Sequence, residues 1–141
     1  MPLTNTPNLK SDKILDFSNR LEGYLSGKSI EKRFNEQFNE SISAKEIFSR
    51  YRKKDSNSIL FINEYKDILA RCLVIIITTL DPDAIVFGGG ISNEIDFLDQ
   101  IKKKTSLFIN EPNLKTVFLK PKYGDASGVR GAAILSRQSS I

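Results

Sequence analysis

Hydrophobic positions recur at helical spacing along residues 56–80, and this is the strongest pattern in the chain. They are Phe61, Tyr65, Ile68, Leu69, Cys72, Leu73, Ile76 and Leu80. Because most lie three or four positions apart, they predict one long amphipathic helix. Every residue from Cys72 to Ile77 is apolar, so we expect this end of the helix to be covered on most sides. The β-branched residues there would also suit a strand, but the helical spacing upstream favours a helix.

Shorter elements are predicted on both sides of this long helix. Residues 21–38 repeat apolar positions near helical spacing, with Gly27 as the break between a short helix and a longer one. Ser43 and Glu46 fit a capping box, in which each side chain accepts a hydrogen bond from a backbone donor at the start of a helix. Downstream, we expect a short buried strand at residues 84–87, a helix at 92–108 and a second strand at 116–119.

The order of these elements predicts the fold class. A strand, a long crossover and a second strand imply parallel pairing and a right-handed connection. A final helix is expected from Gly128 to about Arg137, with Asp125 or Ser127 as its N-cap. The sequence therefore predicts an α/β domain that is rich in helix and has a short parallel sheet. This domain would span residues 18–141, after a poorly ordered lead-in at residues 1–17 that holds two prolines and little periodicity.

Three consecutive glycines, Gly88, Gly89 and Gly90, follow the first predicted strand. Glycine has no side chain, so such a run leaves backbone N–H groups uncovered and lets a phosphate or a ribose approach closely. A helix that begins at Ser92 would point its N-terminus at such a ligand. Tight turns that need a positive φ also use glycine, so the glycines alone leave a nucleotide site and a plain turn both open.

Composition excludes several classes of protein. The chain has 21 basic and 17 acidic residues, and the excess of positive charge falls in residues 28–54. Acidic residues are interspersed there, so we interpret this region as a solvated helical face rather than a nucleic-acid-binding surface. The first twenty residues lack the apolar block of a signal peptide, and no run reaches the ~18 apolar residues that a membrane helix needs. We therefore expect a cytoplasmic protein that binds neither nucleic acid nor a membrane.

Three segments resemble a known family. Residues 80–93 (LDPDAIVFGGGISN) and 122–133 (KYGDASGVRGAA) are similar to the C-terminal signature of the ROK family of sugar kinases and repressors, most of all to its bacterial fructokinases. Residues 21–27 (LEGYLSG) resemble the segment that follows a zinc-binding cysteine cluster in that family. The resemblance implies a truncated C-terminal lobe of an actin-like ATPase, or ribonuclease H-like, fold. It also implies that the N-terminal lobe of the family is absent from this chain.

The resemblance also implies ligands for particular residues. Gly88, Gly89, Gly90 and Ser92 would contact an adenine nucleotide, ATP or ADP with Mg²⁺, as would a second group formed by Gly124, Ser127 and Gly128. The small residues of the second group would equally allow close packing of a helix on the sheet. Glu22 occupies the place of a family glutamate that binds the hydroxyls of a hexose, a role that suits a carboxylate because it accepts two hydrogen bonds at once. A solvent-facing glutamate at a helix start is the alternative.

Other residues of the family pattern are missing. Arg20 stands where the family has the cysteine nearest Glu22, and the chain has no histidine, so a structural zinc site is not expected. The single cysteine, Cys72, lies in an apolar run and is expected to be a core thiol rather than a nucleophile. No Asp-x-Gly-x-Thr phosphate loop is present, and residues 54–57 (KDSN) indicate a helix cap rather than the Asn-Asp pair that carries the catalytic aspartate. No catalytic residue is assigned.

Two functions follow from this reading of the sequence. The first is the nucleotide-binding, C-terminal part of a fructokinase-like kinase, which phosphorylates a hexose only together with a complementary N-terminal lobe. The second is a non-catalytic member of the family that serves as an oligomerisation or binding module. A repressor is less expected, because its helix-turn-helix would lie upstream. We also expect a homo-oligomer, since an incomplete sheet exposes apolar surface and an edge strand.

Overall fold

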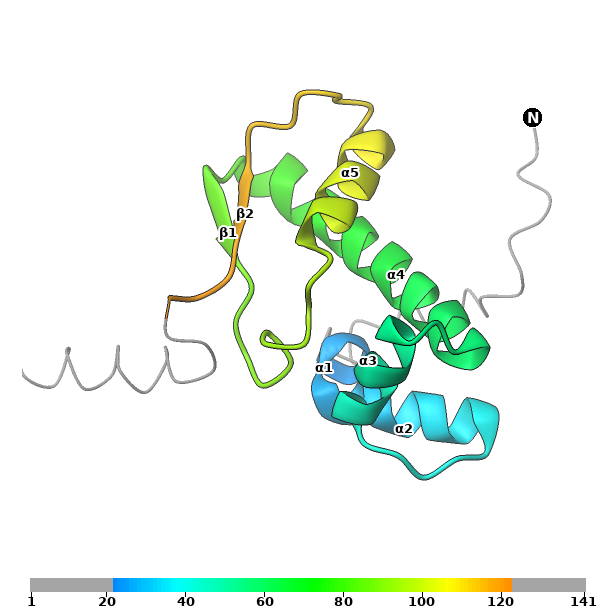
Figure 1. The fold of residues 1–141 in the computed structure, drawn as a ribbon. Helices are drawn as coiled ribbons and strands as arrows, with labels where there is room; N and C mark the ends of the chain where they lie inside the picture. Colours follow the sequence, from blue (N-terminus) through cyan, green and yellow to red (C-terminus); the bar gives the residue numbers. More distant parts are fainter. Residues whose placement is uncertain (1–21, 123–141) are drawn as a thin grey trace, which may run out of the picture.

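The computed structural model describes residues 22–122, which form five helices and two strands (Figure 1). In chain order these are α1 (Glu22–Leu25), α2 (Gly27–Phe38), α3 (Ala44–Arg52), α4 (Ser56–Leu80), β1 (Ala84–Val86), α5 (Leu98–Ile109) and β2 (Val117–Leu119). The long α4 runs from the α2 and α3 end of the molecule to the strands, and α5 packs along it (Figure 1). The expected lead-in at residues 1–17 and the final helix at 128–137 lie outside the described residues. None of the helices described here is both long and apolar enough to cross a membrane.

Side chains that accept hydrogen bonds from backbone N–H groups fix the starts of α3 and α4. Ser43 Oγ accepts from Glu46 N (3.2 Å), which confirms the first half of the predicted capping box. The second half does not form, because the Glu46 carboxylate accepts from Arg50 Nε (3.3 Å) instead. Asp55 accepts from Ser58 N (3.0 Å) and Ser58 Oγ (2.8 Å), and these bonds lower the pKa of Asp55. The cap before α4 and the whole range of α4 are as the sequence predicts.

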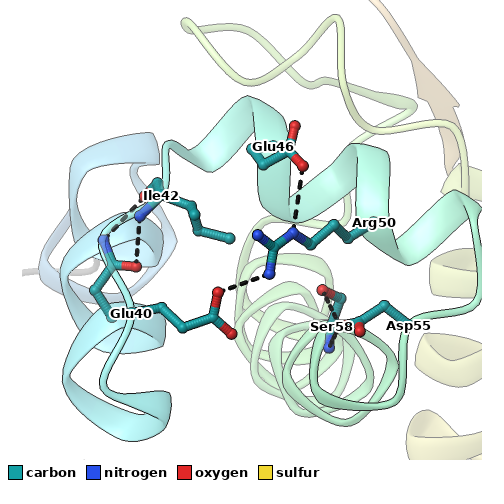
Figure 2. Close-up of polar contacts among 7 residues, drawn as sticks. Glu40, Ile42, Glu46, Arg50, Asp55 and Ser58 are labelled. Atoms are coloured by element: carbon teal, nitrogen blue, oxygen red, sulfur yellow. Dashed lines mark hydrogen bonds and ion pairs between the residues drawn. The ribbon is translucent and has the colours of Figure 1, made fainter.

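Polar side chains also fix the turn between α2 and α3 (Figure 2). Arg50 Nη1 in α3 donates to Glu40 Oε2 (2.6 Å) just after α2, in addition to its bond with Glu46. The side chain of Asn35 donates to the Ile42 carbonyl (2.9 Å) and accepts from Ile42 N (3.0 Å). The two helices are therefore held at a set angle, and their apolar faces are left to pack on the core.

The hydrophobic core lies along one face of α4. It comprises Ile30, Phe34, Ile47, Phe48, Phe61, Ile62, Tyr65, Leu69, Leu73, Ile77, Ile95, Phe97, Ile101 and Leu114. Burying a side chain of this kind contributes ~1.5–3 kcal/mol, so α4, which supplies more of these residues than any other element, organises the domain.

The expectation that the apolar end of α4 is covered on most sides is wrong. Between Cys72 and Ile77, only Leu73 and Ile77 are buried, and Ile75 is 63% exposed. Leu73 and Ile77 lie one turn apart on a single face of the helix, and that face meets α5 and the strands. Since the described elements cover only this side, the other apolar side chains of the run stay partly or largely exposed.

The two strands pair in parallel, as predicted, with Ala84 opposite Val117 and Val86 opposite Leu119. The expectation of a buried strand is wrong, however, because Val86 is 57% exposed and Ala84 is exposed as well. Side chains alternate between the two faces of a sheet, and here helices in the described part of the chain cover one face only. The central residue of each strand reaches the core, while its neighbours form an apolar outer face.

The helix expected from Ser92 begins only at Leu98. Residues 89–95 form turns instead, in which Ser92 N donates to the Gly89 carbonyl (3.0 Å). Ile95 and Phe97 are both buried, and two residues that are two positions apart can face the same core only if the chain between them is extended. Packing of Phe97 against the aromatic rings of α3 therefore overrides the helical spacing of this segment.

Candidate functional site

A groove lies where the start of α2 faces the loop after β1. We name it the glycine groove; its described lining is residues 25–29, 31 and 88–91. It consists of two adjoining hollows of about 790 and 440 Å³, which share Ser26, Gly27, Gly90 and Ile91. In Figure 1 the loop after β1 extends toward α1 and the start of α2, so segments far apart in the sequence meet here.

Gly27 allows these two segments to approach closely. A Cβ atom added to Gly27 would lie 2.6 Å from Ile91 Cγ2, which is shorter than real carbon–carbon contacts. With any other residue at position 27, the side chain of Ile91, α2 or the loop would therefore have to move. The sequence analysis took Gly27 only as a break between helices, and the structure adds this contact.

The three loop glycines do not serve packing against the described part of the chain. Among residues 22–122, nothing lies within 4 Å of a Cβ atom added to Gly88, Gly89 or Gly90. Gly89 has a φ of 94°, so a turn that needs a positive φ accounts for this glycine alone. At Gly88 and Gly90 neither a positive φ nor crowding by a described residue requires glycine, and its presence leaves the backbone uncovered by any side chain of its own.

The first turn of α2 gives the opposite side of the groove its electrostatic character. Ser26 caps the helix by accepting from Ser29 N (3.2 Å), and the exposed Lys28 lines the larger hollow. A helix N-terminus carries a partial positive charge, which Lys28 reinforces, so this side suits an anion such as a phosphate group. Glu31 also lines the hollow, but its carboxylate accepts from Ala44 N (3.1 Å) and so helps to hold α3.

The structure brings together only some of the residues assigned from the sequence. Gly88, Gly89 and Gly90 line the groove. Glu22 begins the short α1, but its side chain lies outside what the structure describes. The second group, Gly124, Ser127 and Gly128, lies outside the described residues. The sequence analysis missed the contribution of residues 26–29 to the groove. Their sequence, Ser-Gly-Lys-Ser, is typical of a capped helix start and could have indicated it.

Ser92 is placed differently from the other loop residues. It is only 2% exposed, it does not line either hollow, and its Oγ has no hydrogen-bond partner among the described residues. Its proposed contact with a nucleotide therefore stays a prediction, one that requires the hydroxyl to become accessible.

Titratable groups elsewhere in the described chain do not form a second chemical site. Burial raises the pKa of the Cys72 thiol, and a raised pKa is the opposite of what activates a thiol as a nucleophile. The pKa of Tyr65 is raised as well, chiefly by burial in the core. Residues 22–122 contain no cluster of three or more acidic, cysteine or histidine side chains that could hold a metal ion.

Comparison with known proteins identifies the class of this molecule. Residues 18–139 match the sequence profile of the ROK family, so the chain belongs to that family. Its fold is that of part of a ROK sugar kinase, an actin-like ATPase fold, here rich in helix with a short parallel sheet. The crystal structure of a ROK family glucokinase from Streptomyces griseus, in complex with glucose and AMPPNP, matches with a TM-score of 0.70 and 25% identity, over 83% of this chain and 44% of that one.

Sequence relatives of this chain include kinases of an N-acetylated amino sugar. The N-acetyl-D-glucosamine kinase of Yersinia enterocolitica is 36% identical over 118 residues, and that of Mannheimia succiniciproducens is 38% identical over 115. Each match covers 82% of this chain and 38% of the relative, so the chain spans less than two fifths of the length of these curated relatives. The structure of ROK hexokinase from Thermus thermophilus shares the fold at a TM-score of 0.68 and 17% identity, over 81% of this chain and 40% of that one.

Proposed function

We propose that this chain is the nucleotide-binding part of a ROK sugar kinase, which transfers the γ-phosphate of ATP to a hydroxyl group of a hexose. The observation that carries the proposal is the glycine groove, in which the bare backbone of residues 88–90 faces the N-terminus of α2. Open space beside each glycine fits a phosphate or a ribose in contact with the backbone. The AMPPNP bound to the Streptomyces griseus glucokinase supports ATP as the ligand.

The groove explains binding and orientation, but not the proton transfer of the reaction. In phosphoryl transfer the protein mainly positions the reactants and stabilises charge, while a carboxylate accepts the proton of the attacking hydroxyl. ATP with its Mg²⁺ supplies the phosphoryl group when bound. The one carboxylate in the described lining, Glu31, is already engaged with α3, so we infer that an N-terminal lobe provides the base and the first phosphate loop.

The sequence motifs suggest fructose as the sugar substrate, but the relatives favour a different hexose. N-acetyl-D-glucosamine kinases among the sequence relatives, and the glucose in the related structure, support an aldohexose or its N-acetyl derivative over fructose. We propose Glu22 as the residue of this chain that binds a sugar hydroxyl. It begins α1, four residues before Ser26 of the groove, so a sugar bound there would lie next to the nucleotide.

A single substitution in the groove tests nucleotide binding. Gly88→Val would add a branched side chain where no residue of the described range 22–122 lies within 4 Å, so we expect it to fold and to keep the melting temperature of the ligand-free protein. Mg-ADP at about 100 times its Kd adds ~2.7 kcal/mol to the stability of the unchanged chain, a rise of several degrees in melting temperature. In Gly88→Val this rise should disappear. No rise in the unchanged chain, or an equal rise in the variant, would refute the proposal.

A mixing experiment tests the kinase reaction. The chain would be combined with the N-terminal lobe of a ROK kinase, and ATP-dependent phosphorylation of N-acetylglucosamine, glucose and fructose would be measured. We expect turnover only in the mixture, with fructose as the poorest substrate. Nucleotide binding without turnover in any mixture would remove the enzymatic proposal and keep the binding one.

The apolar outer face of the sheet favours a second candidate function, self-association. Val86, Val117 and Leu119 are exposed there, and exposed apolar faces and unpaired strand edges mark interaction surfaces. Sedimentation at several concentrations would show a homo-oligomer if this surface pairs, and Val86→Lys should then return the protein to a monomer. A monomer at all concentrations would contradict this second function without affecting the nucleotide proposal.

A further inference from the structure

An arginine of α3, Arg52, binds the segment that follows the loop with the three glycines. Arg52 Nη2 donates to the Glu94 carbonyl (2.9 Å) and to Glu94 Oε2 (3.0 Å), while Arg52 Nε donates to Asp96 Oδ2 (3.0 Å). The planar guanidinium group thus donates hydrogen bonds to one backbone carbonyl and two carboxylates at once. The bonds to Asp96 and then to Glu94 raise the pKa of Arg52. We name residues 94–97, which lead from the glycine loop to α5, the return segment.

A buried lysine holds the other end of the return segment. Lys66 in α4 is 2% exposed, and its Nζ donates to Tyr51 Oη (2.5 Å) and Gln100 Oε1 (2.7 Å). The same Nζ lies 4.6 Å from the centre of the Phe97 ring, within the range of a cation–π contact. The return segment therefore contacts basic side chains of two different helices: Arg52 binds Glu94 and Asp96, and Lys66 lies over the ring of Phe97.

Backbone hydrogen bonds connect the return segment to the glycines. Ser92 N donates to the Gly89 carbonyl (3.0 Å), and Glu94 N donates to the Ile91 carbonyl (2.9 Å). The glycines have no side chains, and none of residues 22–122 comes within 4 Å of the place where a Cβ atom would lie, so no side chain of this part of the chain packs on them there. On the other side, Phe87 N bonds to the Leu119 carbonyl (2.9 Å) of β2. The position of the glycines is thus set by the two ends of the loop.

We propose that Arg52 is a positioning residue of the glycine groove, which acts through Glu94 and Asp96 to hold Gly88–Gly90 opposite the start of α2. As far as the ligand is a nucleotide, this inference rests on the proposed function. The contact is partly exposed, and such ion pairs contribute little to overall stability. The main effect of Arg52 is therefore on the geometry of the loop, and variants at this position are expected to fold.

Arg50 provides a matched control on the same helix. It also binds two carboxylates, those of Glu40 and Glu46, but neither lies in the loop (Figure 2). In the ligand-free 141-residue chain, Arg52→Gln should speed hydrogen exchange at the amides of Ser92 and Glu94, and Arg50→Gln should not. Binding of Mg-ADP, measured by calorimetry, should weaken by about 2- to 30-fold in Arg52→Gln, the range found for residues that act through others. Arg52→Lys, which keeps the charge without the planar fork, should fall in between.

The two measurements separate the two proposals. Unchanged exchange at Ser92 and Glu94 in Arg52→Gln, or the same change in Arg50→Gln, would overturn the positioning role. Faster exchange with an unchanged Kd for Mg-ADP would also overturn it, because the loop would then move without consequence for the ligand. If the unchanged chain fails to bind Mg-ADP, the proposed function falls, and the exchange data still decide whether Arg52 holds the loop.

Discussion

The contact between Gly27 and Ile91 gives a prediction that can be worked from the structure. In Gly27→Ala the new Cβ would lie 2.6 Å from Ile91 Cγ2, so the Ile91 side chain, α2 or the loop must move. Overpacking of this kind costs about 1–3 kcal/mol. Replacing glycine by alanine in a helix returns up to about 1 kcal/mol, and less at a first helical residue such as this one. We therefore expect a net loss of about 1–2 kcal/mol, even though alanine is the better helix former.

A second substitution tests whether the loss comes from this contact. Leucine has no methyl branch at Cβ, so Ile91→Leu removes the atom that the new methyl group of Gly27→Ala would strike, and it keeps the side-chain volume. We expect Gly27→Ala to lose less stability in the Ile91→Leu background than in the unchanged chain. Groups in contact typically couple by about 0.5–3 kcal/mol in such a double-mutant cycle, which places the expected effect within measurable range.

Urea denaturation of the four proteins, followed by circular dichroism, gives the free energies of unfolding. The control for helix propensity is Gln37→Ala, a substitution at an exposed position of the same helix. Stability that is unchanged or increased in Gly27→Ala would refute the reasoning, since the approach of α2 to the loop would then not need glycine. Additive effects of the two substitutions would show that the loss arises elsewhere.

Three further predictions concern single side chains. Ser92→Ala removes a buried hydroxyl that is unpaired within residues 22–122, so the free energy of unfolding should not fall by more than about 1 kcal/mol in urea titrations; a larger loss would reveal a partner. The pKa of Asp55 is lower in the folded protein than its unfolded value of about 3.9, so its contribution is present above that pH and lost as the pH falls further. Between about pH 6 and pH 3, the urea midpoint of Asp55→Asn should therefore decline less than that of the unchanged chain, and an equal decline would contradict this. Lys66→Ala should lower the free energy of unfolding by about 2–4 kcal/mol, because it leaves a cavity and two oxygen atoms without their donor. The control Lys103→Ala, at an exposed position, should change it by no more than about 0.5 kcal/mol. Similar values for the two variants would contradict this prediction.

Local signals in the sequence were sufficient for α4 and for the start of α3. The range of α4 follows from apolar spacing together with the cap at Asp55, and the start of α3 follows from Ser43. These signals act within one or two turns, so no knowledge of distant residues is needed. The parallel pairing of β1 and β2 was also predictable, because a crossover of this length leaves little alternative.

Features that depend on distant contacts could not be read from the sequence. The apolar spacing of residues 95–108 fits a helix throughout, yet Phe97 packs on Phe48 and Tyr51 of α3, and this pulls the chain out of the helix before Leu98. The exposure of Ile75 depends in the same way on which elements reach α4. The type of a residue shows whether it can be buried, but the elements that pack against it in the fold decide whether it is buried.

In and around the glycine groove, different residues are expected to control ligand affinity and protein stability. Gly88 and Gly90 leave space beside bare backbone, so substitutions there should change ligand affinity without changing stability. Arg50 binds carboxylates away from the loop, and its ion pairs are partly exposed, so its loss should change neither stability by much nor affinity. Gly27 and Arg52 set where the loop lies, so their substitution should change affinity through geometry. A groove whose ligand contacts come from backbone must be positioned by side chains elsewhere, which is why residues that touch no ligand are expected to govern its affinity.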